Sequence, residues 1–122
     1  MNYLTIDVST PHVAALPLAM HNYHNDGCKM ICIDYLQKVP KLDPSSKTSK
    51  TEHVEEVADV LLAQSRALDI PIVALAQLNR EGRARSDKRP VLEDLRNSGA
   101  IEQDADNVIM LHRDKKHSSE ME

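Results

Sequence analysis

Aromatic side chains are nearly absent from this sequence of 122 residues, which contains three Tyr and no Phe or Trp. A length of this size fits a single domain. With 41% hydrophobic and 28% charged residues, the composition is typical of a soluble protein. Because aromatic rings are so few, the hydrophobic core must be built from the aliphatic side chains of Val, Ile, Leu, Met and Ala.

Cysteines and long apolar runs are also scarce. Cys28 and Cys32 are too few for a disulfide scaffold, and their spacing differs from the CxxC pattern of zinc and redox sites. No apolar run approaches the length of a membrane helix, about 20 residues, and the first residues, MNYLTIDVST, lack the features of a signal peptide. We therefore expect a cytoplasmic chain with reduced thiols and no membrane partner.

An excess of positive charge is lacking, since the formal net charge is -4. This charge argues against a protein that coats nucleic acid with its whole surface, but residues 80–89 are locally basic. Such a loop can bind phosphates without sequence preference, and base stacking is excluded because the loop has no aromatic residue. The alternative is an ordinary solvated loop. The basic residues are Arg80, Arg83, Arg85, Lys88 and Arg89.

Short apolar segments bounded by turn residues predict four strands, at residues 3–9, 29–36, 70–77 and 107–113. The runs 29–36 and 70–77 are apolar without alternation, which predicts strands buried on both faces, as in a parallel sheet covered by helices. Strands that alternate with helices are typical of an α/β fold with right-handed crossovers. The predicted fold class is therefore α/β, with a mainly parallel sheet and flanking helices.

Two helices are predicted between these strands. The first is expected to begin at Thr10 and Pro11, to run towards Asn25 and to be kinked or split at Pro17, because a proline inside a helix removes a hydrogen bond. The second begins with the capping-box pattern at residues 49–52 and ends before the sequence DIP. Its stripe at helical spacing consists of Val54, Val57, Ala58, Leu61, Ser65 and Leu68.

The remaining segments are polar. Residues 38–51 contain Pro, Ser and Lys and predict a mobile loop, and residues 78–90 predict a second, basic loop. Residues 91–104 are expected to form short helical turns. Residues 115–122 are almost entirely polar and predict a frayed tail.

Polar residues end two of the predicted strands. Asp34 follows the apolar run ICI, and Gln77 ends the next strand, so both are expected beyond the carboxyl ends of parallel strands, at one edge of the sheet. A carboxylate there can hold Mg²⁺ directly or through water, and a neutral amide can orient water or contact a terminal phosphate. The alternatives are an Asp that caps a loop and an ordinary exposed Gln.

Three blocks of sequence resemble a known family. ICIDYLQ, IPIVALAQLNR and SDKRPVLEDLRNSGAIEQDADNVIMLHRD are similar to the C-terminal motor domain of replicative hexameric DNA helicases, the DnaB-like family with a RecA-type core. The resemblance extends over about nine tenths of the chain, from LTIDVSTP to HRD. A recombinase or a clock-type RecA relative fits less well, because the block DLRNSGAIEQDAD fits the replicative helicases best.

The resemblance implies functions for the strand-end residues. Asp34 matches the Walker B aspartate that holds Mg²⁺ beside ATP, and Gln77 matches the glutamine that senses the terminal phosphate and transmits its presence to the DNA loops. The implied activity is ATP-dependent unwinding of duplex DNA. The implied assembly is a homo-hexamer that translocates on single-stranded DNA.

The resemblance also implies contacts with single-stranded DNA. Arg96, Asn97 and Gly99, in LRNSG, match a loop that contacts the DNA backbone, although the family usually has Glu at the position of Asn97. The segment from Lys38 to about Thr51 matches another part of the wall of the central channel. Within the basic loop, Arg83, Arg85, Lys88 and Arg89 are further candidates for phosphate contacts.

One family motif does not occur in these residues. The glycines are Gly27, Gly82 and Gly99, and none belongs to a phosphate-binding GxxxxGK[ST] loop. We therefore expect residues 1–114 to be a partial RecA-like P-loop NTPase core without its P-loop strand. Such a helicase piece would be inactive alone, and a separately encoded N-terminal piece is a candidate partner. The alternative is a non-catalytic DNA-binding or protein-interaction module derived from a helicase.

The missing motif has a consequence for the fold. In RecA-type sheets the P-loop strand lies between the strands that here correspond to residues 70–77 and 107–113. Without it, we expect these two strands either to pair directly or to leave an open sheet edge, which favours aggregation.

Overall fold

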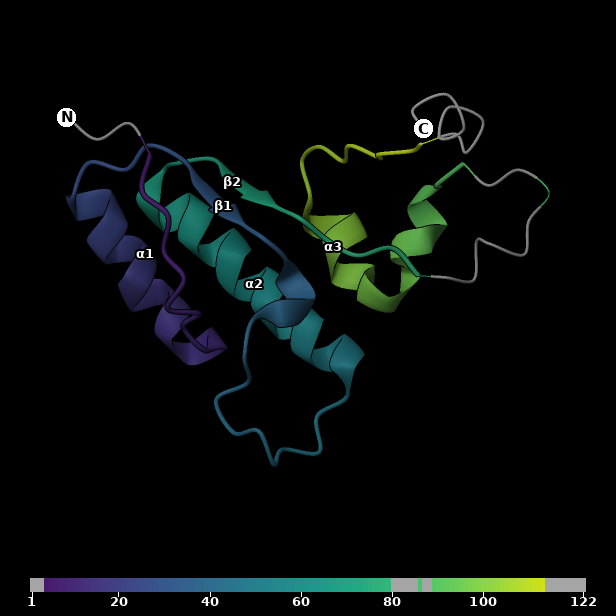
Figure 1. The fold of residues 1–122 in the computed structure, drawn as a ribbon, viewed down its shortest axis with the longest axis horizontal. Helices are drawn as coiled ribbons and strands as arrows, with labels where there is room; N and C mark the ends of the chain where they lie inside the picture. Colours follow the sequence, from purple (N-terminus) through teal and green to yellow (C-terminus); the bar gives the residue numbers. More distant parts are fainter. Residues whose placement is uncertain (1–3, 80–85, 87–88, 114–122) are drawn as a thin grey trace, which may run out of the picture.

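The computed structural model describes residues 4–79, 86 and 89–113 (Figure 1). The elements alternate between helix and strand, which confirms the predicted α/β class. Within the described residues, no helix is both long enough and apolar enough to span a membrane. In chain order the elements are η1 (Val13–Ala15), α1 (Leu16–Asn25), β1 (Ile31–Ile33), η2 (Leu36–Lys38), α2 (Lys50–Leu68), β2 (Ile72–Ala74), η4 (Leu92–Ser98) and α3 (Gly99–Asp104), where η marks a 3-10 helix.

The strands β1 and β2 form a parallel two-stranded sheet. Their register pairs Ile31 with Ile72 and Ile33 with Ala74, so the carboxyl ends of both strands lie at the same edge. The parallel arrangement was predicted, but each strand has three residues and is shorter than predicted. A parallel pair needs a long crossover connection, and α2 with its flanking loops supplies it.

The other two predicted strands are absent from the described residues. Residues 4–9 and 107–113 contain no strand, and most of their apolar side chains are exposed, with Ile6 at 78% and Ile109 at 84%. A strand requires a neighbour that pairs with its backbone N–H and C=O groups, and an apolar sequence alone does not supply one. Residues 70–77 and 107–113 do not pair directly, so of the two expected outcomes the structure has the open edge beside β2.

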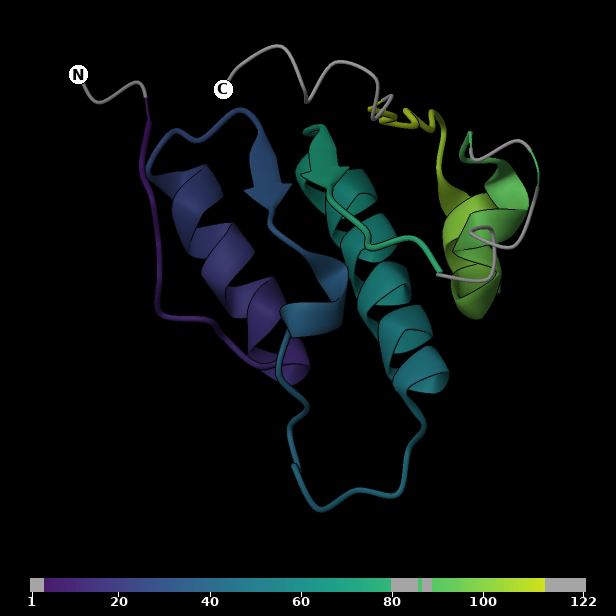
Figure 2. The same ribbon diagram turned by 45° about the vertical axis from the view of Figure 1, so that its right-hand side comes forward.

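The core lies on one face of the sheet. Ile31 and Ile72 pack against the helices α1 and α2, which lie side by side (Figure 2). In contrast, the register partners Cys32 and Val73 are exposed. The prediction that both faces are buried was therefore wrong, because the described residues provide a covering layer for one face only. The buried core residues are Val13, Leu16, Met20, Ile31, Leu36, Val54, Val57, Leu61, Leu68 and Ile70.

The first helix begins later than predicted. Thr10 has a φ of 47°, which is incompatible with a helix, and α1 begins at Leu16 after the short turn η1. The predicted helix is therefore split into η1 and α1 beside Pro17, which is one of the two expected outcomes. Pro17 lies in the first turn of α1, where its missing N–H is not needed. The predicted end is confirmed, because Gly27 adopts a φ of 94°, which glycine tolerates better than other residues.

The second helix, α2, agrees with its prediction. Its capping box is formed, since the Glu52 N–H donates to Ser49 Oγ at 3.1 Å and the Ser49 N–H donates to Glu52 Oε2 at 2.7 Å. The helix ends at Asp69, which adopts a left-handed φ of 51°. Ser65, the polar member of the stripe, is half-buried and donates to the backbone. The buried members are Val54, Val57, Ala58, Leu61 and Leu68.

The C-terminal described segment packs beside α2. The short helical turns predicted for residues 91–104 are confirmed as η4 and α3, and both contact α2. The loop predicted at 38–51 is confirmed for residues 39–49, because no regular element occurs between η2 and α2. Within the predicted loop at 78–90, residues 80–85 and 87–88 lie outside the described residues, as does the predicted frayed tail at 115–122.

Candidate functional site

Asp34 is the first residue after β1. Its side chain is exposed, and the Asp34–Tyr35 peptide bond is cis. No group that the structure describes donates a hydrogen bond to the Asp34 carboxylate, so the alternative of a loop-capping Asp finds no partner among these residues. The carboxylate is therefore accessible at the edge of the sheet where ligands of open α/β sheets bind.

Gln77 lies three residues beyond the end of β2, and its side chain is also exposed. The chain that leads to it remains bound to the chain after β1. The Leu75 N–H donates to the Ile33 carbonyl at 2.9 Å, and the Leu36 N–H donates to the Leu75 carbonyl at 2.9 Å. The pairing of the two strands therefore continues past their assigned ends and keeps the segments of Asp34 and Gln77 together.

Gln37 completes this connection. Its side-chain Nε2 donates to the Gln77 carbonyl at 3.2 Å, and its Oε1 accepts from the Gln77 N–H at 3.1 Å. The sequence analysis missed this residue. The available signal was a side chain that donates and accepts at once, placed three residues after Asp34 on the chain that leaves β1.

The donor set at the sheet edge fits one kind of metal site. The described residues contain no group of three or more His, Cys, Asp or Glu side chains arranged to hold a metal ion. A site made by the protein alone therefore does not fit these residues. Mg²⁺, however, keeps several waters and binds one or two carboxylates together with substrate phosphates. The exposed Asp34 carboxylate fits that arrangement as a single ligand.

Three of the residues predicted to contact DNA lie on η4 and at its junction with α3. Arg96 and Asn97 belong to η4, and Gly99 begins α3. Asp94 holds this turn, because its buried carboxylate accepts from the Val91 N–H at 2.9 Å. The position of the turn is therefore fixed from within η4.

The segment after Gln77 is hydrogen-bonded to η4. The Asn79 N–H donates to the carbonyl of Asp94 at 2.9 Å. The backbone therefore connects the end of β2 with the turn that carries the predicted DNA contacts. Of the other candidates, Arg89 is exposed, and Arg83, Arg85 and Lys88 lie outside the described residues.

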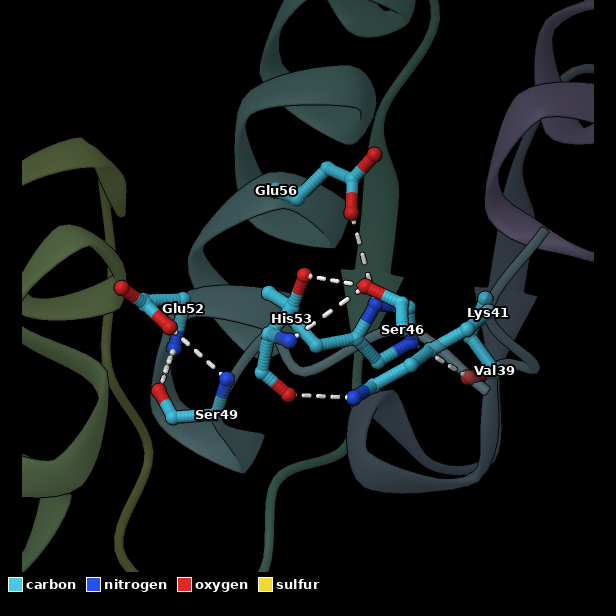
Figure 3. Close-up of polar contacts among 8 residues, drawn as sticks. Val39, Lys41, Ser46, Ser49, Glu52, His53 and Glu56 are labelled. Carbon is cyan, nitrogen blue, oxygen red and sulfur yellow. Dashed lines mark hydrogen bonds and ion pairs between the residues drawn. The ribbon is translucent and has the colours of Figure 1, made fainter. Parts of the chain in front are cut away.

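The loop at residues 38–51 is anchored to the start of α2 (Figure 3). His53 is buried. Its Nε2 lies 2.7 Å from the Val39 carbonyl oxygen, and its Nδ1 lies 3.4 Å from Glu56 Oε2. Lys41 donates to the Thr48 carbonyl across the loop. The sequence analysis missed this anchor, since a lone His in a polar segment gives no signal of its burial.

Two carboxylates of this region have lowered pKa values. The Ser45 hydroxyl and backbone N–H both donate to Asp43 and hold the pKa of its carboxyl below the usual 3.8. The Ser49 backbone N–H, with a smaller contribution from the Ser49 side chain, lowers the pKa of Glu52 below 4.5. Both acids therefore remain charged at neutral pH and contribute local structure.

Solved structures identify the class to which this arrangement belongs. A DnaB-like replicative helicase, solved in a study of its interactions with primase, superposes with a TM-score of 0.77 at 32% identity over 96% of this chain and 29% of its own. The ATPase domain of G40P superposes with a TM-score of 0.76 at 33% identity over 92% of this chain and 40% of its own. The fold is therefore that of RecA-type ATPase domains.

Sequence comparisons identify the family. The model of the DnaB-like helicase C terminal domain matches residues 3–122, and the chain belongs to this family. It is 44% identical to the replicative DNA helicase DnaB of Buchnera aphidicola over 91 residues, which are 75% of this chain and 19% of the relative. It is also 44% identical to DnaB of Geobacillus stearothermophilus over 96 residues, 79% of this chain and 21% of the relative. The chain thus spans about one fifth of the length of these curated relatives.

The structure brings some predicted site residues together. Asp34 and Gln77 both follow strands that end at the same edge, and the side chain of Gln37 bridges the two segments. Gly99 and η4 connect to this edge through the Asn79–Asp94 hydrogen bond. The functions assigned to these residues remain predictions, and they form the basis of the proposal below.

Proposed function

We propose that this chain is part of the motor domain of a replicative DNA helicase, in which ATP hydrolysis drives movement along single-stranded DNA. The observation that carries the proposal is the pair of polar residues, Asp34 and Gln77, beyond the carboxyl ends of two paired parallel strands. Family membership supports it, because the relatives are replicative DNA helicases.

Each of the two residues has a distinct task in this proposal. The Asp34 carboxylate would hold Mg²⁺ directly or through water, and the chemistry supplied there would be neutralisation of charge on the phosphates of ATP. The Gln77 amide contacts the terminal phosphate without adding charge. Since the segment after Gln77 is bonded to η4 through Asn79, a change at Gln77 is transmitted to the turn of Arg96.

The phosphate-binding loop comes from outside these 122 residues, because they contain no GxxxxGK[ST] motif. We propose that its strand pairs with the open edge of β2, between β2 and residues 107–113. Two observations support this position. Within the described part of the chain, β2 pairs with β1 alone. The apolar side chains of Leu75 and Leu111 are 45% and 83% exposed, which leaves apolar surface for an added element to cover.

DNA binding in this proposal depends on phosphate contacts. Backbone contacts give affinity without sequence preference and weaken steeply with salt. A homo-hexamer would arrange these residues around one strand of DNA. The proposed contacts are Arg96, Asn97, Gly99, Arg83, Arg85, Lys88 and Arg89.

The proposal is tested by reconstitution. The 122-residue chain is mixed with a helicase segment that carries GxxxxGK[ST], and ATP hydrolysis is measured with and without single-stranded DNA. We expect ATP hydrolysis only in the mixture, and we expect single-stranded DNA to stimulate it. Asp34→Asn removes the charge of the side chain and keeps its shape, and it should lower the rate of hydrolysis at least ten-fold. Hydrolysis that is unchanged in Asp34→Asn would refute the assignment of the metal ligand.

A second candidate function is a DNA-binding or protein-interaction module without catalysis. The basic segment 80–89, together with the lack of a P-loop motif in these residues, favours it. The same mixture distinguishes the two functions. Salt-sensitive binding of single-stranded DNA by the chain, without any rescue of ATP hydrolysis, supports the module and contradicts the motor.

A further inference from the structure

We propose that Gln37 is a positioning residue that fixes the backbone of Gln77 relative to Asp34, and so sets the position from which the Gln77 side chain reaches the terminal phosphate. This inference rests on the proposed function, since it deepens the role given there to Gln77. It assigns a third residue to the site, and that residue acts through Gln77.

The geometry of the contact supports this role. The Gln37 side chain donates to the Gln77 carbonyl at 3.2 Å and accepts from the Gln77 N–H at 3.1 Å, so it satisfies both backbone groups of one residue. A side-chain amide is suited to this task because it carries a donor and an acceptor on one planar group. The pair resembles one step of a sheet ladder, made by a side chain after the strand has ended.

The contact leaves the functional group of Gln77 available. Both hydrogen bonds use the backbone of Gln77, while its side chain is exposed. Fixing the backbone reduces the freedom that the side chain would otherwise lose when it binds a phosphate. Gln37 thereby prepares Gln77 for its contact without occupying it.

The position of Gln37 in the chain determines which part of the fold holds Gln77. Gln37 belongs to η2, which follows β1 and Asp34, and Leu36 at the start of η2 is buried in the core. The Gln37 backbone is therefore held in place relative to β1 and Asp34. Two residues after Gln77, Asn79 binds the Asp94 carbonyl of η4, so the contact lies between the proposed metal residue and the proposed DNA turn.

The contact itself is tested by amide hydrogen exchange of the 122-residue chain. Gln37→Ala removes both hydrogen bonds, and we expect the Gln77 amide to exchange at least ten-fold faster. The Leu75 amide, which is bonded to the Ile33 carbonyl, should change less than two-fold and serves as the internal reference. An unchanged rate at Gln77 would overturn the proposal.

Gln64→Ala is the matched control. Gln64 is also half-buried, and its Oε1 has no hydrogen-bond partner in the described structure, so the substitution removes the same atoms without removing a contact of this kind. Gln37→Glu is the second variant, because it keeps the size and the acceptor but loses the donor to the Gln77 carbonyl. It provides the test if the alanine variant does not fold.

The functional consequence is tested in the mixture with the P-loop segment. With Gln37→Ala or Gln37→Glu we expect the stimulation of kcat by single-stranded DNA to fall at least five-fold, while the KM for ATP changes less than two-fold. A merely structural role would change both parameters or neither. Gln64→Ala should retain the stimulation.

The two experiments, amide exchange and ATP hydrolysis in the mixture, distinguish a failure of this inference from a failure of the proposed function. If the unsubstituted mixture hydrolyses ATP with DNA stimulation and the Gln37 variants keep that stimulation, the inference is wrong and the proposed function stands. If the unsubstituted mixture shows no hydrolysis, the proposed function fails, and the role of Gln37 in positioning a phosphate sensor fails with it. Amide exchange then reports whether the contact exists as a feature of the fold.

Discussion

The layer formed by α1, β1, α2 and β2 and the C-terminal segment of η4 and α3 differ in how they are held. Every member of the buried hydrophobic cluster lies between Val13 and Ile70. In the C-terminal segment, Leu95 is the buried apolar residue that the structure describes, and α3 has no buried residue. The first region is thus stabilised by its own core, whereas the second depends on its contact with α2.

This difference follows the proposed division of tasks. Asp34 and Gln77, the proposed metal residue and phosphate sensor, follow strands of the first region, where a catalytic geometry can be maintained. Three of the residues proposed to contact DNA, Arg96, Asn97 and Gly99, lie in the segment with fewer buried apolar residues, which we expect to open at lower free energy. A motor needs both properties, and the Asn79–Asp94 hydrogen bond connects the two regions.

The largest effect is expected for the core of the first region. Leu61→Ala removes a buried side chain from the centre of α2 and should lower the free energy of unfolding by about 2–5 kcal/mol. Leu111→Ala, at a position that is 83% exposed, is the matched control and should change it by less than about 0.5 kcal/mol. Urea denaturation followed by circular dichroism measures both, and equal losses would contradict the contrast in burial.

A smaller and more local effect is expected for the second region. Leu95→Ala should lower the free energy of unfolding by about 2 kcal/mol, at the low end for a buried leucine, because Leu95 is buried outside the main hydrophobic cluster. Hydrogen exchange should become faster in η4 and α3 and remain unchanged in α2. A uniform increase over both regions would show that they unfold as one unit.

The capping box of α2 is expected to contribute still less. Ser49→Ala removes the acceptor of the Glu52 N–H and should lower the free energy of unfolding by about 1 kcal/mol. Ser65→Ala, in the last turns of the same helix, is the control for the loss of a hydroxyl group and should have a smaller effect. Thermal denaturation of the unsubstituted chain and the two variants measures which substitution lowers the stability more.

The smallest effect concerns pH. The pKa of Glu52 is lower in the folded chain than its usual 4.5, because its carboxylate accepts from the Ser49 N–H. A lowered pKa means that the unfolded chain binds the proton more tightly, so this contribution is present above pH 4.5 and is lost as the pH falls through the folded value. Stability of Glu52→Gln should therefore depend less steeply on pH below 4.5 than that of the unsubstituted chain.

The sequence predicted the parts of the fold that are encoded locally. The box at Ser49 and Glu52, the buried stripe of α2 and the end of the first helix near Gly27 all depend on neighbouring residues, and all are confirmed. Residues 107–113 have an equally strong apolar pattern but form no strand, because pairing depends on a partner that the pattern does not contain. The prediction that both faces of the sheet are buried was wrong for the same reason, because a covering layer also depends on a partner.

The candidate site shows a similar limit. The shared edge of Asp34 and Gln77 followed from parallel strands, whose carboxyl ends must meet. The contacts of Gln37 and His53 could not be inferred in this way. Gln37 binds a residue 40 positions away, and the imidazole of His53 reaches the Val39 carbonyl across a loop, so both depend on tertiary structure.

Mg²⁺-dependent binding of ATP tests the central claim most directly. Isothermal titration of the 122-residue chain alone should give no measurable affinity, because the P-loop amides and lysine supply most of the contacts with the phosphates. Addition of a segment that carries GxxxxGK[ST] should produce binding that weakens at least ten-fold with Asp34→Asn. Tight, Mg²⁺-dependent binding by the chain alone would contradict this account.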